Sequence, residues 1–305
     1  MLYSKTTPEQ KRLRLREALA SGTVQQFPGA FNPLSARLIQ EKGFPGVYIS
    51  GAVLANDLGL PDIGLTTLTE VAARAGQIAR MTDLPAIVDA DTGFGEPMNV
   101  ARTVQELENA GLAGCHIEDQ VNPKRCGHLD GKSVVDQDTA LKRIRAAVDA
   151  RRDADFLIMA RTDIRAAEAG DAGLRAAADR AKALVDAGAD AVFPEAMATL
   201  EEFAAIRAAV DVPILANMTE FGKSRLFTAD ELAGVGINLI IYPVTLLRIA
   251  MGAAERTLDT IRADGTQEAQ VENMLTRSRL YELVDYEAYS RFDAGVFNFK
   301  VPGRH

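Results

Sequence analysis

The sequence lacks several features that would assign it to other classes of protein. It has only two cysteines, Cys115 and Cys126, and Cys115 lies within an apolar run, so we expect no disulfide framework. No apolar run approaches the length that spans a membrane. The net charge of −8 is spread along the chain without a basic block, so we expect no nucleic-acid partner. The charged stretch 1–16 lacks the apolar core of a signal peptide, and we therefore expect a cytoplasmic protein.

What the sequence does contain is a regular alternation of short apolar runs and amphipathic stretches. Near-continuous apolar runs are typical of strands buried on both faces of a parallel sheet. Eight such runs occur, at 24–28, 46–50, 85–90, 114–118, 156–161, 191–195, 213–216 and 239–242. Helical spacing is found at 8–20, 35–42, 68–81, 100–110, 141–150, 174–187, 200–209 and 229–234.

Eight strand–helix units predict an α/β fold, a (β/α)8 TIM-type barrel. A doubly wound sheet is the competing fold, and the number and even spacing of the units favour a closed barrel. With 305 residues, 47% of them hydrophobic, the chain is expected to form one domain, 1–305, with the barrel at about 22–264. A long helix is predicted at 246–263, and a C-terminal helical extension at about 265–305 has helical patterns at 269–284 and 286–292. These extra helices could serve oligomerisation or be solvated additions.

Polar residues gather where the predicted strands end. In such barrels the chemistry takes place at the carboxyl ends of the strands, so we expect these side chains to meet at one mouth. The residues at the strand ends are Tyr48, Ser50, Gly51, Ala52, Asp89, Asp91, His116, Glu118, Arg161, Asp163, Glu195, Asn217 and Thr219, all of them polar except Gly51 and Ala52.

Three acidic residues at these strand ends predict a metal site. Asp89 and Asp91 are two positions apart and project to one side of an extended segment. Converging with Glu118, they would repel each other unless a cation joined them. Oxygen ligands favour Mg²⁺ or Mn²⁺, whereas zinc prefers His or Cys. The alternative is that Asp91 caps a helix and the other carboxylates form ion pairs.

Arg161 and Cys126 are the other two reactive groups that the sequence indicates. Arg161 ends a buried apolar strand, where a guanidinium needs an anionic partner, and its planar fork suits a substrate carboxylate. An internal carboxylate, Asp163 or Glu195, is the alternative partner, and both roles are compatible. Cys126 lies in a polar loop among cations that favour the reactive thiolate. An incidental loop cysteine is the alternative, and the polarising neighbours of Cys126 favour the reactive thiol over it. In the same loop, His128 could donate to a substrate carboxylate.

Together these groups suit chemistry on a small polycarboxylate. No glycine-rich phosphate loop or dinucleotide fingerprint occurs near them, so a few cations or a metal would have to hold an anionic substrate. A divalent ion stabilises alkoxide or enolate charge as a Lewis acid. With a base for a hydroxyl and an acid for a departing carbanion, a retro-aldol cleavage of a C–C bond follows.

Several motifs resemble the isocitrate lyase / phosphoenolpyruvate mutase superfamily. The most specific is Lys-Arg-Cys-Gly-His at 124–128, and others are Val-Asp-Ala-Asp-Thr-Gly-Phe-Gly at 88–95, Glu-Asp-Gln-Val at 118–121 and Met-Ala-Arg-Thr-Asp at 159–163. The match continues with Phe-Pro-Glu at 193–195 and Leu-Ala-Asn-Met-Thr-Glu-Phe-Gly at 215–222. It covers almost the whole chain, whose length is similar to that of the branch that cleaves 2-methylisocitrate.

The resemblance implies cleavage of 2-methylisocitrate to pyruvate and succinate in the methylcitrate cycle of propionate breakdown. Asp89 and Asp91 would hold Mg²⁺, with Glu118 acting directly or through water and Asp62 beside the metal. Cys126, with Lys124 on the same loop, would protonate the carbanion, and Tyr48 would be the base. The remaining substrate positions implied are Ser50, Gly51, Ala52, Gly127, His128, Arg161, Glu195, Asn217, Met218, Thr219, Arg248 and Arg277.

The resemblance leaves alternatives. The superfamily also includes isocitrate lyases, phosphoenolpyruvate mutases, oxaloacetate hydrolases and dimethylmalate-type lyases. Ala52 departs from the pattern, since some members carry Gly there. A non-enzymatic scaffold should have lost Asp89, Asp91, Arg161 or Cys126, and all four are present. Family members are homotetramers that exchange C-terminal helices, so the resemblance implies such an assembly here.

Overall fold

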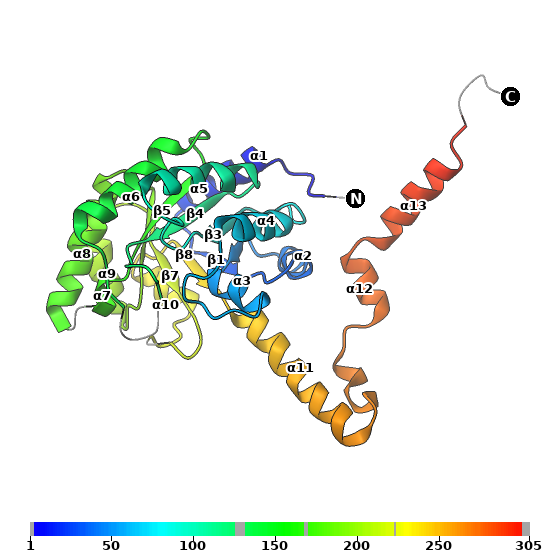
Figure 1. Ribbon diagram of the computed structural model, residues 1–305. Helices are drawn as coiled ribbons and strands as arrows, with labels where there is room; N and C mark the ends of the chain where they lie inside the picture. Colours follow the sequence, from blue (N-terminus) through cyan, green and yellow to red (C-terminus); the bar gives the residue numbers. More distant parts are fainter. Residues whose placement is uncertain (1–2, 126–131, 168–169, 223, 301–305) are drawn as a thin grey trace.

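Eight parallel strands form a closed barrel in the computed structural model, which describes residues 3–125, 132–167, 170–222 and 224–300 (Figure 1). Hydrogen bonds connect strands β2, β3, β4, β5 and β6 side by side in that order. Strands β1, β8 and β7 form a second hydrogen-bonded run in that order. Bridges from Gly29 to Tyr48 and from Val192 to Ile214 connect the two runs, which confirms the predicted barrel. The strands are β1 Gln25–Pro28, β2 Val47–Ile49, β3 Ala86–Asp89, β4 Gly114–Glu118, β5 Leu157–Thr162, β6 Ala191–Pro194, β7 Leu215–Asn217 and β8 Leu239–Tyr242.

Helices surround the strands, and most begin within a few residues of their predicted positions. They are α1 Pro8–Ala20, α2 Pro33–Glu41, α4 Leu68–Ala79, α5 Pro97–Asn109, α6 Gln137–Ala150, α8 Gly170–Asp186, α9 Leu200–Ala209 and α10 Ala229–Gly234. Capping side chains mark several starts: Thr7, Thr67 and Thr228 each accept a hydrogen bond from the third backbone N–H of their helix. Two short helices, α3 Gly51–Asp57 and α7 Ile164–Ala167, were not predicted, because so few residues show no helical periodicity.

The core has two layers, because successive side chains of a strand point to opposite faces. One layer fills the barrel and includes Phe27, Tyr48 and Phe193. The other packs the outer faces of the strands against the helices, and Cys115 belongs to it. Burial raises the pKa of the Cys115 thiol, so this cysteine is an inert core residue. His116, the next residue, points to the inside.

Helix α1 closes the amino end of the barrel. Leu15 and Leu19 pack with the interior layer. Arg12 is 4% exposed and donates to the carbonyl oxygens of Leu112 at 3.0 Å and Glu108 at 2.8 Å. It also forms an ion pair with Asp153 at 2.7 Å. The guanidinium therefore ties α1 to the loops that precede β4 and β5.

The C-terminal part of the chain forms an arm that extends from the barrel (Figure 1). It consists of α11 Thr245–Asp264, a 3-10 helix η1 Glu268–Asn273, α12 Arg277–Leu283 and α13 Tyr286–Phe297. The predicted helix at 269–284 is therefore wrong as one element, since the chain breaks after η1 and Thr276 caps a new helix by accepting from the Arg279 N–H. The division of the chain at about 265 stays a prediction.

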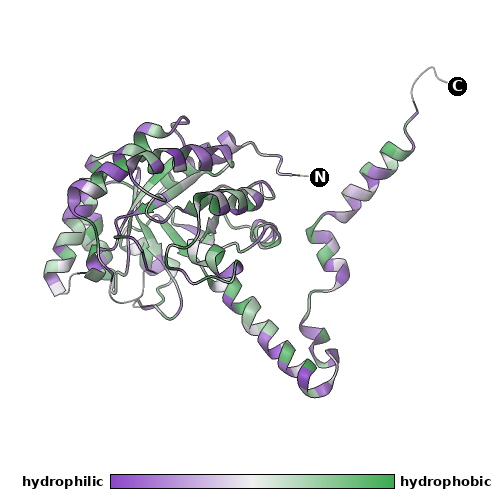
Figure 2. Cartoon of the chain, viewed as in Figure 1, coloured by the Kyte–Doolittle hydropathy of each residue, from purple (hydrophilic) through white to green (hydrophobic). Residues whose placement is uncertain are grey.

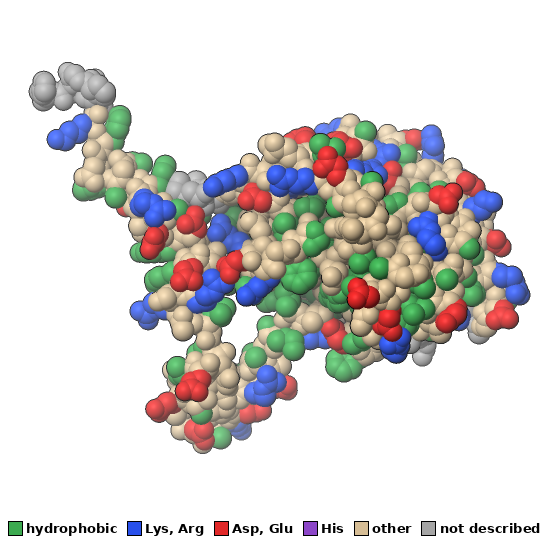
Figure 3. Space-filling view, turned by 180° about the vertical axis from the view of Figure 1, so that it is seen from behind, with side chains coloured by type: hydrophobic (Ala, Val, Ile, Leu, Met, Phe, Trp, Pro, Cys, Tyr) green, Lys and Arg blue, Asp and Glu red, His purple; other side chains and the backbone are tan. Residues whose placement is uncertain are grey.

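Much apolar surface of the arm faces solvent in the single chain. None of the residues of α11, all of which the structure describes, is buried. Figure 2 shows apolar residues along the arm, and Figure 3 shows apolar side chains on the arm and on the barrel face beside it. Contiguous exposed apolar surface of this kind marks an interaction face. Among the described residues, no helix has both the length and the apolar character needed to cross a membrane.

We expect Arg12→Met to lower the free energy of unfolding by about 3 kcal/mol, because it leaves buried carbonyl oxygens and the Asp153 carboxylate without their donor. Urea denaturation followed by circular dichroism measures the change. Arg14→Met is the matched control, since Arg14 lies on the same helix but is exposed, and it should change stability by less than about 0.5 kcal/mol. Equal stability of the two variants would contradict a clamping role for Arg12.

Candidate active site

The carboxyl ends of neighbouring strands bring buried charged side chains together at the mouth of the barrel. The strand register places Asp89 of β3 beside His116 of β4, and Glu118 of β4 beside Arg161 of β5. All four residues are less than a tenth exposed. Charged groups at such positions reduce stability unless they are paired, so their concentration here indicates a functional site.

Asp89 and Asp91 lie next to each other and to the backbone of Gly51. The Asp89 carboxylate accepts hydrogen bonds from the N–H of Asp91 at 2.9 Å and of Gly51 at 3.3 Å. A Cβ atom at Gly51 would lie 2.9 Å from Asp89 Oδ2 and 3.3 Å from Asp91 Oδ1, so only glycine leaves room for the two carboxylates. Asp91 has a left-handed backbone with φ +46°, a conformation that is uncommon for residues other than glycine.

Asp91 and a third aspartate, Asp62, share a cationic partner, Lys124. Its Nζ is 2.5 Å from both Asp62 and Asp91, and its side chain is 3% exposed. Burial and the negative charge of Asp89 raise the pKa of Asp91 to about 6, although Lys124 opposes this shift. Burial lowers the pKa of Lys124, but the surrounding carboxylates more than reverse this and raise it. The pair of aspartates is therefore a place where positive charge is bound.

Arg161 is surrounded by carboxylates. Its Nε is 3.0 Å from Asp163 and 3.3 Å from Glu118, and its Nη2 is 3.1 Å from Glu195. The guanidinium also stacks on Phe193, 5.0 Å from the ring centroid. Burial would lower the pKa of Arg161, but these carboxylates raise it well above its ordinary value. Both internal partners weighed from the sequence, Asp163 and Glu195, are thus present.

Glu118 faces Arg161, and the metal site predicted from Asp89, Asp91 and Glu118 stays a prediction. In the parts of the chain that the structure describes, no three His, Cys, Asp or Glu side chains form a group that could hold a metal ion. Arg161 attracts Glu118, while Lys124 draws Asp91 toward Asp62. Glu118 Oε1 is nevertheless buried without a hydrogen-bond partner among the described residues, so its lone pairs remain available to a cation and its waters, whereas Glu118 Oε2 faces Arg161 and Asp91 Oδ1 faces Lys124.

His116 is a site residue to which sequence analysis assigned no role. Its Nε2 is 2.7 Å from the Tyr48 hydroxyl, its ring stacks on Tyr48, and Phe193 meets it edge-on. Burial lowers the pKa of His116 to about 4, against the opposing charge of Asp89, so the imidazole is neutral. Burial likewise raises the pKa of Tyr48 well above its ordinary value. His116 could have been assigned to the site from the sequence, because strand alternation places its side chain on the same face as that of Glu118.

Comparison with known proteins agrees with this geometry. Residues 15–262 match the family model described as phosphoenolpyruvate phosphomutase. The chain belongs to this family. It is 60% identical, over 99% of this chain and 97% of the relative, to "Probable 2-methylisocitrate lyase 2" of Corynebacterium glutamicum. It is 46% identical to 2-methylisocitrate lyase of Escherichia coli, covering 90% of this chain and 92% of the relative.

A solved structure supports the phosphomutase-family fold. It is a phosphonopyruvate hydrolase in complex with oxalate and Mg²⁺, which aligns with a TM-score of 0.82 and 28% identity. The alignment covers 95% of this chain and 99% of that chain. Magnesium thus occurs in this superfamily, together with a small dicarboxylate.

The remaining predicted site residues of this family member fall into three groups. Ser50 is buried just before α3, Ala52 is half-buried, Asn217 is 3.4 Å from Glu195, and Thr219 accepts from Arg248 at 3.3 Å. These four lie at the carboxyl end of β2 or β7.

Two other predicted substrate residues lie elsewhere, and three are not covered. The Met218 side chain packs in the outer apolar layer, since it alternates with its neighbours, so no side-chain contact with substrate is expected. Arg277 is exposed on α12, and Arg279 of the same helix pairs with Glu41 at the end of α2, near the amino ends of the strands. Arg277 therefore does not reach the barrel mouth of its own chain. Cys126, Gly127 and His128 lie outside the described residues.

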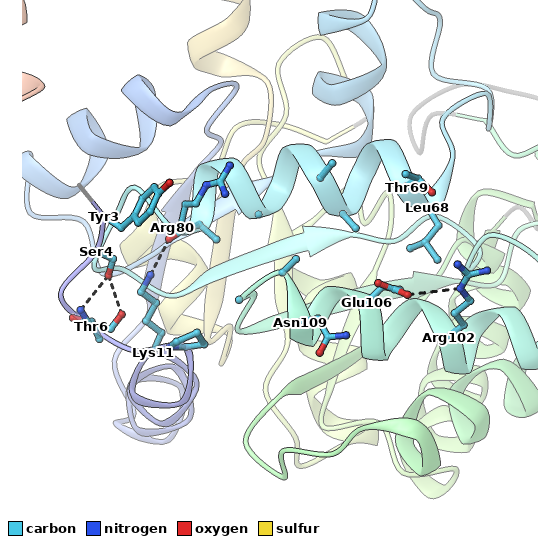
Figure 4. A pocket seen from close by; sticks show the side chains of 17 residues that line it. Tyr3, Ser4, Thr6, Lys11, Leu68, Thr69, Arg80, Arg102, Glu106 and Asn109 are labelled. Atoms are coloured by element: carbon cyan, nitrogen blue, oxygen red, sulfur yellow. Dashed lines mark hydrogen bonds and ion pairs between the residues drawn. The ribbon is translucent and has the colours of Figure 1, made fainter. Parts of the chain in front are cut away.

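Two cavities among the described residues of this phosphomutase-family chain differ in their distance from the site. A cavity of about 650 Å³ borders Asp91 and is lined by polar residues that include Thr66, Asn99 and Asn122. A groove of about 790 Å³ lies on the outside of the barrel between α4 and α5 (Figure 4). Its α4 wall is made mostly of small residues such as Ala72, Ala73 and Gly76, and its Arg102 and Glu106 are paired at 3.8 Å, so we assign no reaction to this groove.

We expect Gly51→Ala to weaken Mn²⁺ binding at least about tenfold, because the added methyl group displaces the Asp89 carboxylate. Electron paramagnetic resonance of free Mn²⁺ measures the affinity without relying on turnover. Gly234→Ala is the control, because a Cβ atom added at Gly234, at the end of α10, would meet no other side chain or loop within 4 Å. This variant should bind Mn²⁺ as the wild type does. Unchanged affinity in Gly51→Ala would place the ion elsewhere.

Proposed function

We propose that this chain is a carbon–carbon lyase that cleaves 2-methylisocitrate to pyruvate and succinate with Mg²⁺, in the methylcitrate cycle of propionate catabolism. The observation that carries the proposal is the pairing of an aspartate cluster with a carboxylate-lined arginine at one barrel mouth, in a chain 60% identical to a probable 2-methylisocitrate lyase. We also propose that the enzyme is cytoplasmic, because two cysteines without a disulfide framework fit a reducing compartment.

The site suits Mg²⁺, an ion that keeps several waters and uses one or two carboxylates. Asp89 and Asp91 would hold the ion, with Glu118 acting through water and Asp62 next to it. Glu118 Oε1, buried without a hydrogen-bond partner among the described residues, and the glycine that leaves room for the carboxylates of Asp89 and Asp91 support this arrangement. When bound, the ion supplies Lewis acidity toward the hydroxyl and carboxylate oxygens of the substrate. Mn²⁺ is expected to substitute.

The side chains of the mouth account for the proton transfers. Tyr48 would take the proton of the substrate hydroxyl while its own phenol proton passes to Nε2 of the neutral His116, which lies 2.7 Å from the phenol oxygen. The bond between the hydroxyl carbon and its neighbour then breaks, which forms the carbonyl of pyruvate and leaves the electron pair on the succinate carbon. Cys126, with Lys124 in the same loop, would protonate that carbon.

Binding and orientation of the substrate fall to the polar residues around these groups. Arg161, oriented by Glu195, would hold a substrate carboxylate. The others proposed to line the pocket are Ser50, Gly51, Ala52, Gly127, His128, Asn217, Thr219 and Arg248. Isocitrate lyase activity is the runner-up, since its substrate lacks only a methyl group on the hydroxyl-bearing carbon.

We expect exhaustive chelation to abolish cleavage and Mg²⁺ or Mn²⁺ to restore it. Among 2-methylisocitrate, isocitrate and oxaloacetate assayed side by side, the first should have the highest kcat/KM. Because burial of one methyl group discriminates by about 10–200-fold, residual isocitrate cleavage should be measurable. Full activity after chelation would refute the metal role, and equal or better efficiency on isocitrate would make the chain an isocitrate lyase.

We further propose that the chain forms homotetramers in which the C-terminal arms are exchanged. The exposed apolar residues of α11 and α13 and the position of Arg277 far from its own mouth support this, since exchange would let that arginine approach a neighbouring mouth. Phe292 and Val296 are four residues apart on α13 and are 56% and 59% exposed.

We expect Phe292→Glu/Val296→Glu to reduce the tetramer to smaller species in size-exclusion chromatography with light scattering, because charge in an apolar interface is costly. Ser290→Glu adds a charge to an exposed polar position of the same helix and should leave the assembly intact. A wild-type monomer, or an unchanged tetramer in the double variant, would contradict the proposal.

A further inference from the structure

Lys132 is a buried cation that the reaction described above does not use. It lies in the connection between β4 and α6, where a lysine would ordinarily extend its ammonium group to water. Its side chain is instead 1% exposed, and its Nζ is 2.5 Å from Oδ1 of Asp163, whose side chain is fully buried. A buried charged pair rarely adds net stability, because desolvation of both charges offsets their attraction, so its presence here suggests another purpose.

The carboxylate that Lys132 contacts is shared with Arg161. Asp163 Oδ1 accepts from Arg161 Nη2 at 3.2 Å, and Asp163 Oδ2 accepts from Arg161 Nε at 3.0 Å. Asp163 therefore lies between two cations. Arg161 also faces Glu118 at 3.3 Å and Glu195 at 3.1 Å, so three carboxylates surround one guanidinium and Lys132 supplies the second positive charge of this cluster.

One edge of the Arg161 guanidinium is left for a ligand. The internal carboxylates engage Nε and Nη2, and within the described parts of the chain Nη1 makes no hydrogen bond. A substrate carboxylate that approaches Nη1 experiences the summed charge of the whole cluster. Three carboxylates around a single cation would give the cluster a net negative charge and repel the substrate carboxylate. A second cation, Lys132, reduces that repulsion.

We propose that Lys132 is a positioning residue for substrate binding: by neutralising Asp163, it keeps the Arg161 guanidinium aligned and electropositive toward a substrate carboxylate. Lys132 itself does not touch the substrate. The inference rests on the proposed function in one respect, that Arg161 receives a carboxylate group.

The test compares two ligands of the same shape and different charge. Succinate carries two carboxylates, and succinamate replaces one of them with an uncharged amide. In isothermal titration calorimetry with Mg²⁺ present, Lys132→Met should weaken succinate binding about tenfold or more and succinamate binding distinctly less. Lys132→Arg retains the charge and should restore most of the succinate affinity. In the lyase assay, KM should rise more than kcat falls.

Two variants control for other effects of the substitution. Lys142 and Asp138 form a pair at the same distance of 2.5 Å, but their side chains are 64% and 75% exposed, so Lys142→Met should bind both ligands as the wild type does. Lys132→Met/Asp163→Asn removes one charge of each sign and should bind succinate more tightly than Lys132→Met alone.

Wild-type succinate affinity in Lys132→Met, or an equal loss for both ligands, would overturn the proposal, because a purely structural role does not depend on ligand charge. If circular dichroism shows Lys132→Met to be unfolded, the affinities of Lys132→Met/Asp163→Asn and Lys132→Arg for succinate and succinamate are compared instead. Lys132→Arg should then bind succinate nearly as the wild type does, and loss of its succinate and succinamate affinity to the same extent would overturn the proposal. The wild type is also assayed for cleavage. If the wild type has no lyase activity but Lys132→Met loses more affinity for succinate than for succinamate, the proposed function is refuted and the role of Lys132 is supported. If the wild type is an active lyase and Lys132→Met loses no affinity or loses it equally for both ligands, only the role of Lys132 is refuted.

Discussion

The mouth of the barrel depends on one buried guanidinium, that of Arg161. Its contacts with Glu118, Asp163 and Glu195 connect the carboxyl ends of β4, β5 and β6, and its face rests on Phe193. Each of these carboxylates is nearly inaccessible to water, so any of them left without the arginine would be an uncompensated buried charge. The cluster is costly for stability, and its value lies in presenting a rigid, directed cation to an anionic ligand.

A second group of charges, the Asp89–Asp91 pair, adjoins the first. Lys124 and Asp62 complete it on one side, and Glu118 borders it on the other. Glu118 is therefore the residue through which the two halves of the site affect each other electrostatically. Parallel strands of a closed barrel deliver their ends to one rim, which is why residues from five strands meet within a few ångströms.

The barrel was predictable because its signal is repeated. Eight apolar runs separated by helical patterns leave few other closed arrangements, and a one- or two-residue error at a strand end does not alter the topology. The errors concern short or weakly packed elements. Helices α3 and α7 are too short to show a period, and the break between η1 and α12 lies in an arm without a buried core, where no hydrophobic face constrains the chain.

For the site, sequence by itself determined which residue types stand at the strand ends and on which face. The alternation of side chains along a strand placed His116 and Glu118 inward and Met218 outward. Met218 was nevertheless predicted to line the substrate pocket, because this alternation was not applied to it. Only tertiary structure decided the partners: Tyr48 with His116, Lys124 between Asp62 and Asp91, and Lys132 with Asp163. The physical reason is that position in a strand sets direction over one or two residues, whereas the partner of a long charged side chain is set by the balance of all buried charges within reach, contributed by segments far apart in the chain.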